Sequence, residues 1–461
     1  MVWRRRRSRN VATHQRAGTL ATILLALVCL LPAAPAAAVE VQRVISPGGI
    51  EAWLVEDHSN PILSLELSFR GGGALDPADK VGLANMVSGL IDEGAGPLDS
   101  QAFQGQLENL SIRLRFNAGL DTFGGSLRTL TENRETAFEM LRLALTEPRF
   151  DAEPVERIRA QLLARLRSQE NDPNMLASRA FRRLMFAEHP YARQVDGTET
   201  SVKAIETADL KRFVAERFAR ANLKVGVVGD ITADELSALL DETFGALPAE
   251  PAPGVIAEIA AQAAGDLIVI EQDVPQSSVV LGHGGMKRDN PDYYTAYVVN
   301  YILGGGGFAS RLYEEVRENR GLAYTVYSYL NALDHSGLVL GGVGTANARV
   351  AESIAVIREE WQRMAEQGPS AEELDAAKTY LTGSYPLRQT SSSRIAGMLV
   401  GIQLEELGID YMDRRNGLIE AVTLEDAKRV AATLYQPEKL TVVVVGKPEG
   451  LEPTREAPGG S

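Results

Sequence analysis

Residues 222–229, NLKVGVVG, decide the fold because the same pattern returns later in the chain as residues 439–446, KLTVVVVG. Each stretch is a short apolar run that ends in glycine, which is typical of a buried strand. Each also follows a helical run, at 207–218 and 423–435, that begins at a threonine able to cap a helix. The two final glycines are 217 residues apart. A repeat of this length predicts two similar halves.

Other features recur at nearly the same offset. The alternating stretch 61–69 predicts a half-buried strand that runs into glycines, and residues 275–281 are its counterpart. An apolar helix is predicted after each strand, at 81–91 and at 294–303. Capping boxes are expected at Thr232/Glu235 and Ser370/Glu373. Strands and helices do not alternate strictly, so the predicted class is α+β.

The domain boundaries follow from the repeat and from composition. We predict one domain at 39–247 and a second at 266–447, joined by an Ala/Pro-rich linker at 248–265. The Pro/Gly-rich tail at 448–461 is expected to be disordered.

The N-terminus predicts export. A basic segment with four consecutive arginines precedes an apolar run at about 20–31, and an A-x-A site follows at 36–38. We expect a signal peptide at 1–38 and a periplasmic location, with an N-terminal membrane anchor as the alternative. The single cysteine, Cys29, lies inside this segment. The exported chain would therefore have neither disulfides, nor a thiol nucleophile, nor a Cys-ligated zinc site.

The charge is strongly acidic. The chain has 47 Lys and Arg against 61 Asp and Glu, a formal charge of −14. Loss of residues 1–38 removes six arginines and no acid, which gives −20. Such a surface argues against nucleic acid or an anionic membrane as the partner.

Residues 82–94, GLANMVSGLIDEG, have the shape of a zinc-protease helix without its ligands. An inverted zinc motif, H-x-x-E-H, places two imidazoles and a general base on one helix. The corresponding positions here are Asn85, Ser88 and Gly89. Zinc prefers Cys, His and carboxylate ligands, so these positions read as a degenerate metal site and we expect no cofactor in this chain. The remaining histidines, at 58, 189, 283 and 335, have no helical pair spacing.

Residues 310–324, SRLYEEVRENRGLAY, resemble the second-domain signature of the M16 family (pitrilysin/insulinase, mitochondrial-processing-peptidase-like). Supporting matches are the glycines at 71–73 with 82–84, and His189-Pro190-Tyr191. The resemblance covers residues 40–447. It implies two similar α+β domains, each a largely antiparallel sheet backed by helices, that close around a peptide chamber.

The resemblance also implies where a third zinc ligand would be. In active members a distal Glu completes the site, and it would fall near Ala164 or Arg165. Glu156 and Glu170 are nearby but out of register. Both imidazoles, the general base and the third ligand are therefore missing together.

The second-domain pair is retained as Arg317 and Tyr324. In the family these groups reach towards the substrate, where a guanidinium and a phenol can donate hydrogen bonds to a carbonyl. In two-subunit members, zinc and this pair belong to different chains. The alternative is that Arg317 pairs with Glu314 and Glu318 on a charged helix and that Tyr324 packs on a strand.

The tetraglycine at 304–307 lacks the Lys-Ser/Thr of a phosphate loop, which argues against nucleotide binding. It predicts a mobile loop beside a peptide, or a helix end.

These observations lead to three hypotheses. The first is a non-catalytic subunit of a periplasmic M16-type zinc peptidase, which pairs with a zinc-bearing M16 subunit, closes the chamber and offers Arg317 and Tyr324 to a peptide or unfolded protein. The second is a peptide-binding or scaffold protein without catalytic involvement. The third is an active zinc endopeptidase with a displaced metal site.

Overall fold

Two sheets with the same strand order organise the chain. The computed structural model describes residues 40–457, so the predicted signal peptide and Cys29 lie outside the described residues. The first sheet has the order β1-β2-β6-β3-β5-β4, and the second has the order β7-β11-β8-β10-β9. From β2 and β7 onward the two orders correspond strand by strand, with the repeated sequence forming β6 in one and β11 in the other.

Both sheets are antiparallel except for one parallel pair each, β2 with β6 and β7 with β11. The predicted α+β class with two similar sheets is confirmed. The strands of the first sheet are β1 (Gln42–Ile45), β2 (Glu51–Glu56), β3 (Ile62–Arg70), β4 (Arg113–Ala118), β5 (Thr122–Leu130) and β6 (Leu223–Gly229). Those of the second are β7 (Leu267–Glu271), β8 (Gln276–Gly284), β9 (Ala323–Leu333), β10 (Ser336–Ala346) and β11 (Thr441–Gly446).

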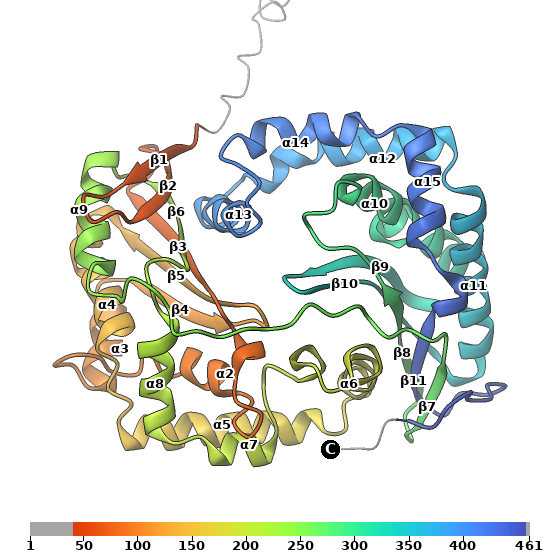
Figure 1. Cartoon of the computed structure of the whole chain (residues 1–461), viewed down its shortest axis with the longest axis horizontal. Coiled ribbons are helices and arrows are strands. Elements are labelled where there is room, and N and C mark those ends of the chain that lie inside the picture. Colours follow the sequence, from red (N-terminus) through yellow and green to blue (C-terminus); the bar gives the residue numbers. More distant parts are fainter. Residues whose placement is uncertain (1–39, 458–461) are drawn as a thin grey trace, which may run out of the picture. The chain divides into compact units, whose positions relative to one another are not determined.

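Helices cover both faces of each sheet (Figure 1). In the first half they are α2 (Leu83–Ser88), α3 (Ser100–Asn109), α4 (Arg134–Thr146), α5 (Ala152–Gln169), α6 (Pro173–Phe186), α7 (Glu199–Ala204), α8 (Thr207–Arg217) and α9 (Ala233–Phe244). In the second half they are α10 (Tyr293–Asn300), α11 (Val350–Gln367), α12 (Ala371–Gly383), α13 (Ser392–Leu404), α14 (Tyr411–Glu420) and α15 (Leu424–Leu434), with π-helical turns at Tyr301–Gly305 and Tyr313–Glu318.

The helix ends follow local chemistry with two departures from prediction. The capping boxes at Thr232 and Ser370 form as predicted. Thr207 does not cap its helix, because α8 begins one residue earlier with Glu206 at the N-cap. The helix predicted over 81–91 is shorter, since α2 begins after Gly82, which is left-handed at φ 99°, and ends at Ser88 with Gly89 as its C-cap.

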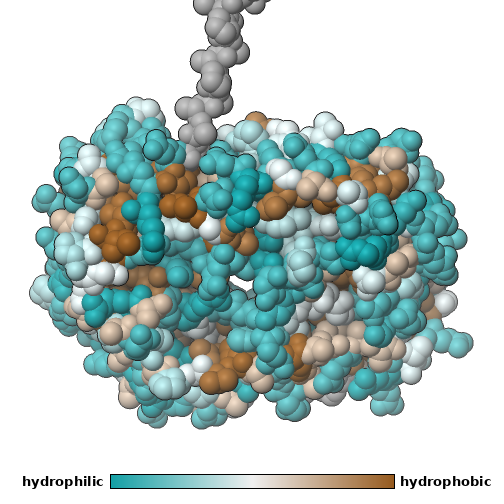
Figure 2. Space-filling view, turned by 45° about the horizontal axis from the view of Figure 1, so that its top comes forward, coloured by the Kyte–Doolittle hydropathy of each residue, from teal (hydrophilic) through white to brown (hydrophobic). Residues whose placement is uncertain are grey.

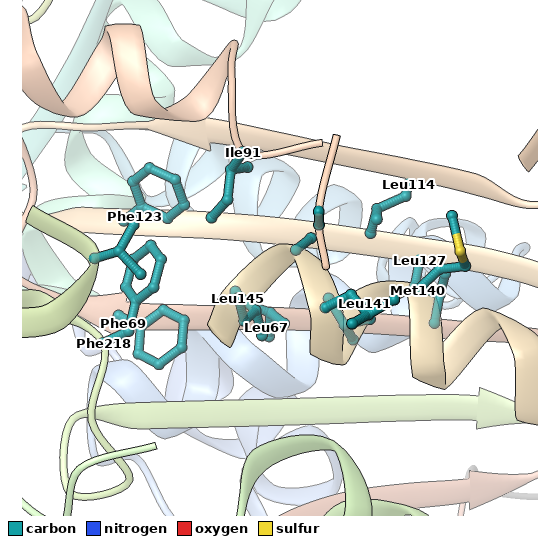
Figure 3. Close-up of a cluster of buried hydrophobic side chains, with 14 of the residues drawn as sticks. Leu67, Phe69, Ile91, Leu114, Phe123, Leu127, Met140, Leu141, Leu145 and Phe218 are labelled. Atoms are coloured by element: carbon teal, nitrogen blue, oxygen red, sulfur yellow. The ribbon is translucent and has the colours of Figure 1, made fainter. Parts of the chain in front are cut away.

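Each sheet buries its alternating apolar face. In the first half, Leu67 and Phe69 on β3 and Phe123 on β5 point into a core that also contains Phe218 (Figure 3). The rings of Phe69 and Phe218 stack with centroids 4.5 Å apart. A corresponding core in the second half contains Trp361, which is fully buried.

The other face of each sheet is covered by a helix from the opposite half. Helix α13 lies on β6 and β3, and α6 lies on β8 and β11 (Figure 1). The Gln403 side chain on α13 donates to the Val225 carbonyl on β6 at 2.9 Å. Phe181 on α6 is buried together with Val443 and Val445 of β11. The two halves therefore exchange one helix each, and contacts join the chain from Val41 onward into one unit.

The segments predicted as linker and tail are hydrogen-bonded. Residues 251–266 form neither helix nor strand, but the Ile259 amide donates to the His335 carbonyl at 3.0 Å and the Gln262 amide to the Met185 carbonyl at 2.8 Å. In the region for which disorder is predicted, Thr454 donates its amide to the Leu267 carbonyl at 2.8 Å. Both segments therefore have ordered backbone hydrogen bonds, although their amino-acid composition is typical of linkers and disordered tails.

The visible face of the molecule is mostly hydrophilic, with separate hydrophobic patches (Figure 2). Within residues 40–457, no helix combines the length and the hydropathy that a membrane span requires.

Glu66, in the middle of β3, yields a stability prediction. Its side chain lies on the face that α13 covers, makes no hydrogen bond or ion pair within residues 40–457, and burial raises its pKa to about 7. Because the folded pKa lies above the unfolded one, this group destabilises the fold progressively as the pH rises from about 5 towards 8. We expect Glu66→Gln to stabilise the chain by about 1–2 kcal/mol at pH 8 and by almost nothing at pH 4. Urea unfolding at both pH values measures this difference, and an equal effect at both would contradict it.

Candidate functional site

The predicted pair Arg317 and Tyr324 lies together in the second half. The Arg317 guanidinium carbon is 4.8 Å from the ring centroid of Tyr324 and 4.8 Å from that of Tyr313. The Phe308 ring meets Tyr313 edge-on with centroids 4.8 Å apart. A guanidinium held between two aromatic faces is fixed in orientation while its N–H groups remain available at the edge of the stack.

The backbone explains why these groups meet. Tyr313 and Arg317 are four residues apart in one helical turn, here π-helical, and residues at this spacing lie on one face of a helix. Tyr324 sits at a β-bulge, because Thr325 pairs with Gly344 while Ala323 pairs with Thr345. A bulge re-aims the side chain of its extra residue. Tyr324 is accordingly 77% exposed, with its ring beside Arg317.

The alternative role for the pair is not what the structure shows. Among residues 40–457, the Arg317 side chain makes no hydrogen bond or ion pair, and in particular none with Glu314 or Glu318. Tyr324 is too exposed to be a packing residue of its strand. The guanidinium therefore has its hydrogen-bond donors free for a ligand.

The tetraglycine at 304–307 lets the end of its helix pack closely against the backbone of β9. A Cβ on Gly304 would lie 2.6 Å from the Ser328 amide nitrogen on β9, and a Cβ on Gly306 would lie 2.8 Å from the Tyr301 carbonyl oxygen. The π-helical turn ends at Gly305, and Gly307 has φ 56°. The glycines thus form the predicted helix end and allow it to approach β9 closely.

The degenerate metal-site positions lie on α2 in the first half. Asn85 donates its side-chain amide to Asp196 at 3.2 Å, and the Ser88 hydroxyl donates to the Asn85 carbonyl at 2.8 Å. A Cβ on Gly89 would touch Ile158 of α5 at 3.4 Å. Asn85 offers only an amide, the Ser88 hydroxyl is bonded to the helix backbone, and Gly89 has no side chain and packs against Ile158. They do not fit a zinc ion.

The remaining candidate ligands do not gather elsewhere. Ala164 and Arg165 on α5 are exposed, and Glu156 pairs with Arg159 at 3.2 Å. His58 contacts Asp230, His189 contacts the Ala257 carbonyl, His283 is buried against Trp361, and His335 contacts Glu258. Within the part of the chain that the structure describes, no three His, Cys, Asp or Glu side chains could hold a metal ion together.

Two charged residues near α2 were missed by the sequence reasoning. Asp196, which accepts from Asn85, interacts electrostatically with Arg182 on α6, and Arg182 also interacts with Tyr329 on β9. Burial lowers the pKa of Arg182. Arg182 and Tyr329 line a cavity of about 90 Å³ between α6 and the second sheet. Arg182 and Tyr329 are distant in sequence and belong to no motif, so no signal in the sequence indicated their proximity.

The two sets of predicted residues stay separate in this chain. Asn85, Ser88 and Gly89 share neighbours on α5 and the Asp196 loop, whereas Arg317 and Tyr324 pack with Tyr313. No hydrogen bond, ion pair or ring contact among residues 40–457 joins one set to the other.

Comparisons with known proteins identify the family. Residues 204–381 match the family described as peptidase M16 inactive domain. The chain is 31% identical over 342 residues to a non-peptidase homolog, YmxG, of Helicobacter pylori. This alignment covers 74% of this chain and 79% of that protein. It is 27% identical over 428 residues to an uncharacterized zinc protease of Mycobacterium tuberculosis, covering 87% and 92% of the two chains.

Solved structures agree. A peptidase M16 inactive domain from Pseudomonas fluorescens superposes with a TM-score of 0.83 at 30% identity, covering 90% of this chain and 99% of that one. A protease from Helicobacter pylori shares the fold with a TM-score of 0.80 at 18% identity, over 88% and 100% of the two chains. Sequence and fold together show that this chain is a member of the peptidase M16 family, with a segment that matches the inactive domain of that family.

Proposed function

We propose that this chain is a non-catalytic subunit of an M16-type zinc peptidase. It pairs with a separate, zinc-bearing M16 subunit, closes the peptide chamber, and presents Arg317 and Tyr324 to the substrate. The observation that carries this proposal is the free guanidinium of Arg317, held between two rings in a chain whose own metal positions are an amide, a hydroxyl and a glycine.

Arg317 and Tyr324 can contribute one interaction to catalysis, the stabilisation of a substrate carbonyl. The Arg317 N–H groups and the Tyr324 hydroxyl can donate hydrogen bonds to the carbonyl oxygen of a peptide bond. These bonds strengthen as negative charge develops on that oxygen, so they favour the transition state over the bound substrate. The aromatic clamp keeps the guanidinium in place before substrate arrives, which lowers the cost of ordering it.

The sequence supports a cellular location and a substrate class for this subunit. The basic and apolar N-terminal residues support export to the periplasm, and the acidic charge supports a peptide substrate over nucleic acid or an anionic membrane. Zinc is supplied by the partner, and no cofactor is assigned to this chain.

The test is reconstitution. The chain is mixed in increasing ratio with a zinc-bearing M16 subunit from the same source, and cleavage of an unfolded peptide is followed. We expect cleavage to rise with added chain and to level off at equimolar ratio, because each active site needs one chain of each kind. No gain over the zinc-bearing subunit alone would overturn the proposal.

The other two hypotheses give different results in the same assay. A scaffold without catalytic involvement would bind its partner, yet cleavage would not change when Arg317 or Tyr324 is replaced. A peptidase with a displaced metal site would cleave peptide without any partner, and a chelator would abolish that cleavage.

A further inference from the structure

Three arginines occupy one face of the first sheet at its free edge. Arg113 and Arg115 alternate on β4, and Arg128 on β5 lies directly opposite Arg113 in the ladder. Leu114, between the first two, points into the core, so all three arginines lie on the face away from it. Like charges placed directly across a ladder are unfavourable, so this arrangement costs stability without a compensating ligand.

These arginines have no counter-ions in the described part of the chain, although acids outnumber bases by 61 to 47 in the whole sequence. All three are exposed, and none makes an ion pair or a side-chain hydrogen bond in the described structure. Elsewhere on the surface arginines do find partners, as Arg43 does with Glu51 at 2.7 Å on β1, the other edge of the same sheet.

The surface beside the arginines is open and concave. Arg113 and Arg128 line a cavity of about 540 Å³ whose walls also include Ile62, Leu130 and Glu108. Strand β4 pairs only with β5, and the backbone of residues 113–118 makes no other hydrogen bond within residues 40–457. The strand therefore offers unpaired backbone groups to an incoming extended segment.

The equivalent edge of the second sheet is different. Strand β9 takes the place of β4, and its exposed face carries Thr325, Tyr327 and Tyr329. The positive charge therefore belongs to one edge and is not a general consequence of the fold.

We propose that the surface formed by Arg113, Arg115 and Arg128 selects polypeptide segments with acidic side chains at alternate positions. This inference rests on the proposed function for its ligand, an extended peptide, and adds the substrate class. Residues two apart on a strand are separated by about 7 Å and point to one face. A segment added to the β4 edge repeats this spacing, so an Asp-x-Asp or Glu-x-Glu sequence meets Arg113 and Arg115 in register, with Arg128 behind them.

The experiment measures peptide binding by the full chain alone, by fluorescence anisotropy. Three labelled peptides of equal length carry two acids at alternate positions, the same two acids side by side, or two amides in place of the acids. The alternate-acid peptide is expected to bind on the order of 10-fold more tightly than the amide peptide, since each exposed charge pair contributes modestly. The side-by-side peptide has the same charge but directs its acids to opposite faces, so we expect weaker binding from it.

The variants assign the effect to the surface. Arg113→Gln combined with Arg115→Gln should remove the preference for the alternate-acid peptide. Arg43→Gln, at the other edge of the sheet, is the matched control and should keep it. The double variant removes a like-charge pair, so its melting temperature should not fall, and lost binding then cannot be ascribed to unfolding.

Several outcomes would overturn the inference. These are equal binding of the two acidic peptides, an equal loss in Arg43→Gln, no peptide binding at all, or competition by inorganic polyphosphate as strong as that by the alternate-acid peptide. The proposed function is judged separately by the gain in cleavage on reconstitution. A chain that supports its partner yet shows no acidic preference would keep the proposed function and lose this inference.

Discussion

Arg317→Ala is expected to lower the kcat of the reconstituted pair on the order of 100-fold, the typical effect of removing one oxyanion-stabilising donor. Within residues 40–457 the guanidinium packs on aromatic rings and makes no hydrogen bond or ion pair, so its removal leaves no buried polar group unsatisfied and should not disturb folding. The loss should therefore lie in kcat, with little change in the assembly of the two chains.

Tyr324→Phe separates the two roles of that residue. It keeps the ring that stacks on Arg317 at 4.8 Å and removes only the hydroxyl. We expect a smaller loss than for Arg317→Ala, because the guanidinium stays oriented. Peptide cleavage at saturating substrate gives kcat for each variant.

Arg320→Ala is the matched control. Arg320 follows the same π-helical turn and is exposed, but it is paired with Glu315. Its replacement should leave kcat within about twofold, since an exposed ion pair contributes little. Equal losses for Arg317→Ala and Arg320→Ala, or no loss for either, would contradict a substrate role for Arg317.

Gly226→Val is expected to destabilise the chain by about 3 kcal/mol, in the range of overpacking effects. Gly226 lies on β6 where α13 crosses it. A Cβ there would lie 2.5 Å from the Ala396 carbonyl oxygen and 3.0 Å from the Leu399 Cβ. The backbone of α13 cannot relieve contacts this short by a small shift, so the helix would have to move away from β6. The packing of α13 on the first sheet would then be lost, while that of α6 on the second sheet would remain.

Gly397→Ala provides the control on the same helix. A Cβ at Gly397 meets nothing within 4 Å. Alanine is the better helix former, so this variant should be more stable by up to about 1 kcal/mol. Urea unfolding of both variants measures the difference. A Gly226→Val protein as stable as the parent would show that α13 is not seated on β6.

Much of the fold could be predicted because it depends on local pattern. The repeated strands β6 and β11, the alternation in β3 and the capping boxes at Thr232 and Ser370 are all written in short stretches. The exchange of α6 and α13 could not be predicted. An apolar helix face has the same periodicity whichever sheet it covers, so the choice of partner is fixed only by contacts distant in sequence.

The candidate site divides in the same way. That Asn85, Ser88 and Gly89 do not suit a zinc ion is a matter of side-chain chemistry and is visible in the sequence. The clamp of Arg317 between Tyr313 and Tyr324 was not foreseen, since it combines a π-helical turn with a bulge that directs Tyr324 towards Arg317. Neither backbone feature has a reliable sequence signal. Arg182 and Asp196 come together only through tertiary contacts.

The central claim is that this chain binds no metal ion of its own and completes the active site of a zinc-bearing partner subunit. The most direct test is metal analysis of the purified, isolated chain, with peptide cleavage assayed on the same sample. We predict zinc far below one equivalent and no cleavage until a zinc-bearing subunit is added. One equivalent of zinc together with chelator-sensitive cleavage by the chain alone would contradict the account.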